Sequence, residues 1–165
     1  MTGLDTPPPL DSRPRFPAAH ADVAADLERL FTATPMYDTL GIRLLDWGLG
    51  WARLAMTTSP TLGNLAGSLH GGATFTLADA AFEIACNSYG RMAVALESTV
   101  HYHHPAPLDA EITADAWELS RGGRTASYRL QVSDDAGRVL VSYLALAYRT
   151  SRWHVDAARL PDGWG

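Results

Sequence analysis

The sequence predicts an α+β protein of the kind in which an antiparallel sheet is wrapped around one long central helix. The first observation is a run of strong helix formers and large apolar residues over residues 70–89, which begins at two glycines. The second is a set of strand patterns on both sides of this run, two before it and four after it. Because strands and helices do not alternate along the chain, the sheet is expected to be antiparallel.

The central helix is apolar at nearly every angle, which is typical of a helix covered on most sides in the middle of a domain. A carboxylate halfway along it, Asp79, would be costly to bury without a partner, so we expect this residue to have a function. The alternative is a structural carboxylate bonded to Ser, Thr or backbone donors across an interface. Glu83 follows one turn later, where repulsion would raise the proton affinity of one of the two acids, although a solvated rim position is its simpler interpretation.

Length, composition and charge indicate one globular domain. The chain has 165 residues, 47% of them hydrophobic, and a net charge of -5, which gives no indication of nucleic acid or an anionic membrane as a partner. The one cysteine, Cys86, is expected in the core and allows no internal disulfide, which fits a reducing compartment. Since the amino terminus lacks the apolar segment of a signal peptide and no run is long enough to span a membrane, we expect a cytoplasmic protein.

The ends of the chain are expected to lie outside the domain. Residues 1–17 carry five prolines and predict a flexible arm, with an arm laid across a partner subunit as the alternative. The helical spacing of apolar residues over 18–32 predicts an amphipathic helix, and a short helical turn follows over 36–40. The domain is therefore expected to span residues 18–150, and residues 151–165 to form a C-terminal tail.

Alternating apolar and polar residues predict the six strands. They cover residues 42–47, 51–58, 94–102, 111–119, 125–132 and 139–148. Gly122 and Gly123 predict a tight two-residue turn, and the apolar character of both faces of the last strand predicts a central or dimer-buried position. Since such a sheet covers only part of the central helix, a second copy of the chain is expected to cover the rest, in a homodimer or a dimer of dimers.

The start of the central helix is a candidate oxyanion site. Gly71 and Gly72 leave backbone N–H groups free at the positive end of the helix dipole, where an oxyanion developing from a thioester or ester carbonyl would be stabilised. A plain helix cap is the alternative. Asp79 lies about 13 Å further along the axis than His70, at about 1.5 Å per residue, and cannot serve the same carbonyl. It would reach a carbonyl held by a neighbouring subunit whose helix runs antiparallel across a two-fold axis.

Two polar residues precede the helix: Asn64 lies within a loop over residues 59–69, and His70 follows this loop directly. Asn64 is expected to form a turn, or to orient water or substrate through its amide. His70 is expected to fix the loop by hydrogen bonding, with acid–base chemistry as the alternative.

Two further clusters have competing interpretations. Of the histidines at positions 101–104, only His101 and His103 share a strand face and no third ligand is placed, so no metal site is predicted. Arg121 and Arg124 flank the glycine turn, where they fit phosphate binding and an ordinary charged turn equally well.

Residues 64–90, N-L-A-G-S-L-H-G-G-A-T-F-T-L-A-D-A-A-F-E-I-A-C-N-S-Y-G, resemble the signature of hotdog-fold acyl-CoA thioesterases of the phenylacetyl-CoA (PaaI) type. The resemblance extends over about residues 26–150 and includes the S-R-G-G-R-T and D-D-A-G-R turns. It implies the hotdog fold, a functional dimer often paired into a tetramer, and no cofactor beyond the CoA of the substrate.

The resemblance also implies roles for single residues. Asp79 would act on water or directly on the thioester carbonyl, Gly71 would donate the oxyanion hydrogen bond, Asn64 would position water, and His70 would support the loop. In relatives CoA lies along the sheet edge near the positions that match residues 121–125. The expected substrate contacts are therefore Gly72, Phe82, Glu83, Arg121, Gly122, Arg124 and Thr125.

The sequence departs from the family pattern at two places, and the acyl group is left open. Glu83 stands where relatives usually have a small or apolar residue, and residues 101–104 replace a more apolar strand end. Ala95 lacks the serine that some related thioesterases use. The expected activity is hydrolysis of an acyl-CoA, with an aromatic, phenylacetyl-like acyl group of phenylacetate degradation as one option. A hotdog protein that binds acyl-CoA without hydrolysing it is the alternative, and a dehydratase is disfavoured because no paired histidine and acid motif is present.

Overall fold

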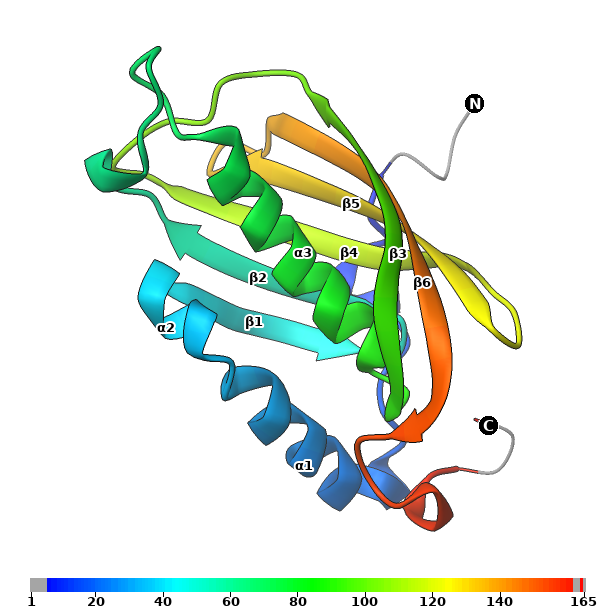
Figure 1. The fold of residues 1–165 in the computed structure, drawn as a ribbon. Helices are drawn as coiled ribbons and strands as arrows, with labels where there is room; N and C mark the ends of the chain where they lie inside the picture. The colour runs from blue at the N-terminus through cyan, green and yellow to red at the C-terminus, as the bar shows by residue number, and fades with distance from the viewer. Residues whose placement is uncertain (1–5, 162–163, 165) are drawn as a thin grey trace.

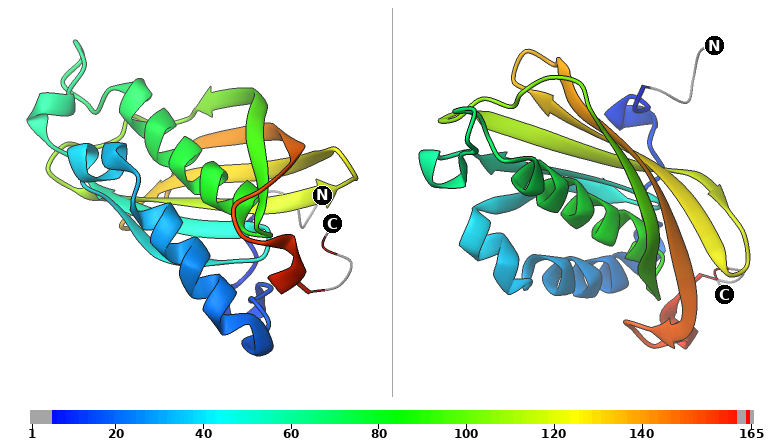
Figure 2. Two further views of the ribbon diagram at one scale, coloured as in Figure 1. Left: turned by 60° about the horizontal axis from the view of Figure 1, so that its bottom comes forward. Right: turned by 45° about the horizontal axis from the view of Figure 1, so that its top comes forward.

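A six-stranded antiparallel sheet curls around one long helix, which confirms the predicted fold class (Figure 1). The computed structural model describes residues 6–161 and 164. Helix α3 (Gly71–Asn87) lies in the hollow of the sheet, while α1 (Ala21–Thr32) and α2 (Pro35–Leu40) lie beside it (Figure 2). The strands, in sheet order, are β1 (Ile42–Gly48), β2 (Trp51–Thr57), β4 (Glu111–Arg121), β5 (Thr125–Asp134), β6 (Val139–Trp153) and β3 (Arg91–Tyr102).

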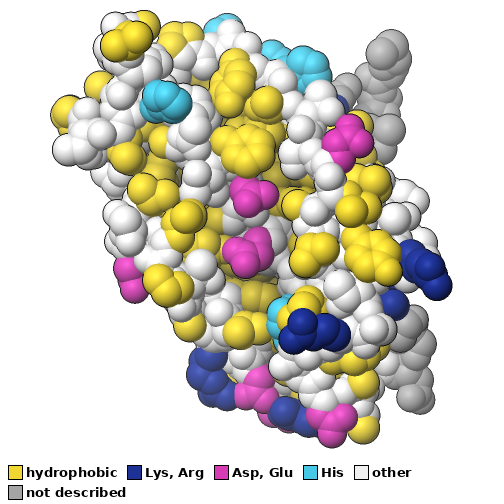
Figure 3. Space-filling view, in the orientation of Figure 1, with side chains coloured by type: hydrophobic (Ala, Val, Ile, Leu, Met, Phe, Trp, Pro, Cys, Tyr) yellow, Lys and Arg dark blue, Asp and Glu magenta, His cyan; other side chains and the backbone are white. Residues whose placement is uncertain are grey.

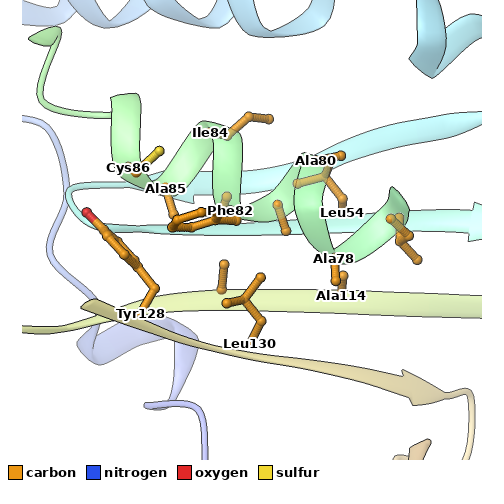
Figure 4. Packing of buried hydrophobic residues seen from close by; sticks show 14 of the residues in the cluster. Leu54, Ala78, Ala80, Phe82, Ile84, Ala85, Cys86, Ala114, Tyr128 and Leu130 are labelled. Carbon is orange, nitrogen blue, oxygen red and sulfur yellow. The ribbon is translucent and has the colours of Figure 1, made fainter. Parts of the chain in front are cut away.

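Helix α3 begins at the predicted glycine and packs one side against the sheet. Small residues let the helix approach closely, since Ala81 and Ala85 are fully buried. The ring of Phe82 meets that of Tyr128 on β5 edge to face, with 5.3 Å between centroids (Figure 4). Burying a side chain of this size stabilises a fold by about 1.5–3 kcal/mol. No helix in the described residues is long and apolar enough to span a membrane.

The strand faces follow the predicted alternation over most of the sheet. Ala52, Leu54 and Met56 of β2 are fully buried. Leu130 and Val132 of β5 line the same core. The last strand, β6, pairs with β5 on one side and β3 on the other, which confirms its predicted position inside the sheet.

Strand β3 differs from its prediction. It is an edge strand that begins at Arg91, and a bulge between Ala95 and Glu97 interrupts the expected alternation. Val94 and Leu96 are 48% and 56% exposed. The apolar residues of β3 are thus largely uncovered in the single chain.

The hairpin between β4 and β5 has three loop residues, 122–124, so the predicted two-residue turn is wrong. The N–H of Gly122 donates to the carbonyl of Thr125 at 2.8 Å. Nη1 of Arg149, on β6, donates to the carbonyl of Gly122 at 2.7 Å. A side chain from a third strand therefore helps to fix the loop conformation.

The described part of the N-terminal arm packs on the sheet, so the expectation of a flexible arm is wrong there. It runs behind the sheet in Figure 1, on the face opposite α3. Arg13 is buried and forms an ion pair with Asp115 at 2.8 Å. The guanidinium groups of Arg13 and Arg15 lie 4.9 and 4.7 Å from the centroid of the Trp51 ring. Cation–π contacts and a buried ion pair thus hold a proline-rich segment on the sheet.

The described part of the C-terminal tail also belongs to the domain. β6 continues beyond Tyr148 to Trp153, and Leu160 is 8% exposed. The predicted boundary at residue 150 therefore falls inside the last strand.

Replacing Arg13 with alanine is expected to lower the free energy of unfolding by about 2–4 kcal/mol, because it removes the ion pair of 2.8 Å from the buried Asp115 and leaves the longer contact of 3.5 Å to Arg53. Urea denaturation would measure the loss. Arg15→Ala is the matched control, since its ion pair with Asp46 is partly exposed and is expected to contribute at most about 1 kcal/mol. Equal losses in the two variants would contradict a special role for the buried pair.

Candidate active site

The first turn of α3 presents one free backbone donor. The N–H of Gly72 donates to Nδ1 of His70 at 2.9 Å, so the His70 side chain caps the helix. This places the histidine in the loop-fixing position expected of it and leaves Gly72 no free N–H for a substrate. The N–H of Gly71 has no hydrogen-bond partner among the described residues. Gly71 is therefore the donor available at the positive end of the helix dipole.

The side-chain amide of Asn64 forms all of its hydrogen bonds within the loop. Nδ2 donates to Oγ of Ser68 at 2.9 Å and to the carbonyl of Leu69 at 3.2 Å. Oδ1 accepts from the N–H groups of Ala66 and Ser68. These four bonds are the full capacity of an asparagine amide, so this conformation favours turn formation over the positioning of water.

A cavity of about 420 Å³ opens beside Gly71. The hydroxyl of Tyr102 donates to the carbonyl of Gly71 at 3.3 Å, and a Cβ at position 71 would lie 3.0 Å from the Tyr102 ring. A side chain at position 71 would crowd the Tyr102 ring, which explains why glycine occupies this position. The cavity is lined by Asn64, Ser68, Leu69, Gly71, Thr74, Tyr102, His103, His104, Pro105, Ala106 and Val141.

Asp79 lies on the side of α3 that the sheet does not cover. It is exposed in the single chain. Figure 3 shows acidic side chains over α3 within a largely hydrophobic surround. Asp79 and Glu83 line a groove of about 270 Å³ between α3 and β3, together with Phe82 and Val94. The helix is covered on its sheet side only, and its acidic side remains open.

The two acids of α3 influence each other. Partial burial, and then the charge of Glu83, raise the pKa of Asp79. Glu83 is held in place, because the hydroxyl of Tyr37 on α2 donates to its Oε2 at 3.0 Å. Glu83 is exposed, as the sequence favoured, and this hydrogen bond also holds its carboxylate. Nothing in the local pattern of residues 36–40 indicated Tyr37.

Phe82 belongs mainly to the core. Its side chain lines the groove beside Asp79, but the residue is only 2% exposed and its ring contacts Tyr128. As an expected substrate contact it offers little free surface.

The β4–β5 hairpin carries several arginines. The guanidinium of Arg121 lies 3.9 Å from the centroid of the Tyr89 ring, and its Nε lies 3.4 Å from Oε1 of Glu118. Arg124 is exposed at the tip, next to the exposed Thr125. Of the two arginines expected to bind phosphate, Arg121 thus contacts Tyr89 and Glu118, whereas Arg124 is open to solvent.

Arg149 is a residue of this corner that sequence reasoning missed. It is 6% exposed, and burial, followed by the charges of Arg91 and Arg121, lowers its pKa. Only the pairing of β6 with β3 and β5 brings it here, and no short motif signals that register. The corner therefore carries more positive charge than Arg121 and Arg124 alone predict.

The histidines near residue 102 do not form a metal site. Nε2 of His103 lies 2.8 Å from Oγ of Ser142. Across the residues whose positions are described, no group of three His, Cys, Asp or Glu side chains could hold a metal ion.

Asp79 and Gly71 do not meet within one chain. Both belong to α3, eight residues apart, which corresponds to about 12 Å along the axis. The single chain thus carries the free N–H of Gly71 and the carboxylate of Asp79 at separate positions on one helix.

The comparisons with known proteins agree on one family. Residues 66–141 match the family model described as "Thioesterase superfamily". The chain is 32% identical over 116 residues to a putative esterase of Archaeoglobus fulgidus, covering 70% of this chain and 75% of the relative. It is 32% identical over 110 residues to the acyl-coenzyme A thioesterase PaaI of Escherichia coli, covering 67% and 79%. The structure of the E. coli PaaI protein from the phenylacetic acid degradation operon superposes with a TM-score of 0.76 at 28% identity, over 81% of this chain and 96% of that one.

Proposed function

This chain belongs to the thioesterase superfamily and is a thioester hydrolase, and from that premise we propose that it hydrolyses an acyl-CoA to the free acid and CoA. The observation that carries the proposal is the pair of half-sites on α3. One is the unpartnered N–H of Gly71, and the other is the carboxylate of Asp79 with its raised pKa.

A homodimer brings the two halves together. β3 is an edge strand with exposed apolar residues, Val94 and Leu96 among them, and such an edge is a template for pairing with another strand. If β3 pairs antiparallel with its own copy across a two-fold axis, the neighbouring α3 helices lie side by side and run in opposite directions. Asp79 of one subunit then faces the Gly71 end of the other. Two such dimers form the proposed dimer of dimers.

The two half-sites have different roles in the proposed reaction. The N–H of Gly71 stabilises the oxyanion as the thioester carbonyl becomes tetrahedral. Asp79 either removes a proton from the attacking water or attacks the carbonyl itself. Collapse of the tetrahedral intermediate breaks the C–S bond, and CoA leaves as the thiol after taking up a proton. Where water attacked, this step gives the acid directly; where Asp79 attacked, it leaves a mixed anhydride of the acyl group with Asp79, which a water molecule then hydrolyses. The net reaction consumes one water and yields a carboxylic acid and CoA.

The arginine corner is the proposed contact for the phosphates of CoA. Arg124 is exposed, and Arg149 fixes the loop that carries it. The acyl group is proposed to lie near Asp79 and the groove beside it, which is large enough for an aromatic, phenylacetyl-like group. The cytoplasm is the proposed location, since the one cysteine is buried and a CoA substrate requires no oxidising compartment.

A thiol-release assay over aliphatic and aromatic CoA esters tests the activity. We expect release of one thiol per ester consumed and a preference within the panel that identifies the acyl group. The competing proposal is an acyl-CoA-binding protein without turnover. Tight binding of CoA esters in calorimetry together with no thiol release across the panel would favour that alternative.

A further inference from the structure

The pair formed by Tyr37 and Glu83 is the feature that the proposed mechanism leaves unused. We propose that Glu83 is a positioning residue for the reaction: a second negative charge, fixed one helical turn from Asp79 by the Tyr37 hydroxyl, that strengthens Asp79 as a base. This inference rests on the proposed function, because it assigns Asp79 the role of the acid that activates water.

The geometry of Glu83 is that of a held charge. Its Oε2 accepts a hydrogen bond of 3.0 Å from the hydroxyl of Tyr37, which is 5% exposed, and the carbonyl of Ala80 lies further from that hydroxyl, at 3.3 Å. The tyrosine joins α2 to α3 and comes from 46 positions away in the sequence. Because Tyr37 is buried, its hydroxyl is held in one position, and the hydrogen bond that it donates keeps the Glu83 carboxylate in place.

Glu83 lies where two grooves meet. One contains Asp79, and the other, of about 270 Å³, contains Tyr37 and His154. Both are also lined by Asn87 and Ala93. On α3 the two acids are four residues apart, which places their Cβ atoms about 5–6 Å from each other on the same face.

The other titratable groups around this pair are neutral near pH 7. Burial raises the pKa of Tyr37 on α2, of Cys86 on α3 and of Tyr143 on β6. Burial, and then the charge of Arg152, lower the pKa of His154. Within the described part of the chain neither acid of α3 forms an ion pair with an arginine. The field of Glu83 on Asp79 is therefore not cancelled by a neighbouring cation.

The variant that tests the proposal is Glu83→Gln, which keeps the shape and can still accept from Tyr37. Asp79 is active as the carboxylate, so kcat/KM rises as the pH increases through its pKa. This rise is the acidic limb of the pH profile. Loss of the neighbouring Glu83 charge is expected to move the limb to lower pH. On the limb, kcat/KM as a fraction of its plateau is expected to be about 3- to 10-fold higher than in the wild type. On the plateau kcat is expected to fall about 2- to 5-fold, since a weaker base is less effective, while KM stays unchanged.

Tyr37→Phe and Asp135→Asn are the companion variants. The first removes the hydrogen bond and keeps the ring, so the limb is expected to move in the same direction by less. The second removes one negative charge in the exposed β5–β6 turn and is expected to leave the profile unchanged. A titration of the Asp79 carboxyl carbon by NMR, in the wild type and in Glu83→Gln, reports the same shift without turnover.

The outcomes separate this inference from the proposed function. A limb that stays in place in Glu83→Gln, with hydrolysis retained, overturns the inference and leaves the function standing. A change in KM for particular acyl groups without a shift of the limb also overturns it and makes Glu83 a substrate contact. An inactive wild type overturns the function, and the NMR titration then still decides whether Glu83 acts on Asp79.

Discussion

Asp79→Asn is expected to lower kcat/KM for the preferred acyl-CoA by at least about 1,000-fold. The amide keeps the shape of the carboxylate but can neither take a proton from water nor attack the carbonyl. Because Asp79 is exposed in the single chain and makes no hydrogen bond within the described residues, the substitution leaves the packing of the fold intact. Steady-state thiol release measures the loss, and turnover near that of the wild type would reject Asp79 as the acting acid.

The same variant is expected to be at least as stable as the wild type at neutral pH. The pKa of Asp79 is raised in the folded chain, so the folded state binds its proton more tightly than the unfolded state does. Such a group stabilises the fold at low pH, and this contribution is lost as the pH rises through the folded pKa. Asparagine removes the charge that burial and Glu83 disfavour. A thermal melt at pH 7 checks this, and a lower Tm would mean that the lost activity reflects misfolding.

Leu96→Arg is expected to convert the proposed dimer into monomers and to lower kcat/KM at least about 100-fold. In a two-fold interface a residue near the axis lies close to its own copy, so one substitution introduces two like charges that repel each other. Separated subunits keep Gly71 and Asp79 about 12 Å apart on one helix, and neither then completes a site. Sedimentation velocity measures the change of mass, and thiol release measures the loss of activity.

The matched control lies on the other edge of the sheet. Leu45 on β1 is an exposed leucine, 45% exposed against 56% for Leu96. Leu45→Arg introduces the same charge on an edge strand and is expected to leave both mass and activity unchanged. If this variant dissociates the protein and Leu96→Arg does not, the interface is at β1 and the proposed site across β3 is wrong.

Local periodicity was sufficient to predict most of the fold. Apolar residues at every second position of β2, such as Leu54 and Met56, identified the buried face because side chains alternate along a strand. Gly71 and Gly72 identified the start of α3 because they come directly before a run of strong helix formers. Both signals act over a few residues and are visible in the sequence itself.

The contacts that shape the site join residues far apart in the sequence, and no local pattern reports them. Glu83 meets Tyr37 across 46 positions, and Arg13 meets Asp115 across 102. The bulge in β3 depends on its register with β6, which sequence alternation does not specify. An apolar helix likewise shows that it must be covered, but not whether its own chain or another copy covers the side that carries Asp79.

The position of β3 in the sheet also affects how the chain is made. This strand is synthesised before β4, β5 and β6, yet within the described part of the chain its partner in the sheet is β6, the last of them. On the ribosome, an apolar segment that contains Val94, Leu96 and Val100 therefore stays unpaired until residues 139–153 have emerged. Non-local pairing of this kind slows folding and exposes the nascent chain to aggregation. Truncation of the gene before β6 should thus yield insoluble product.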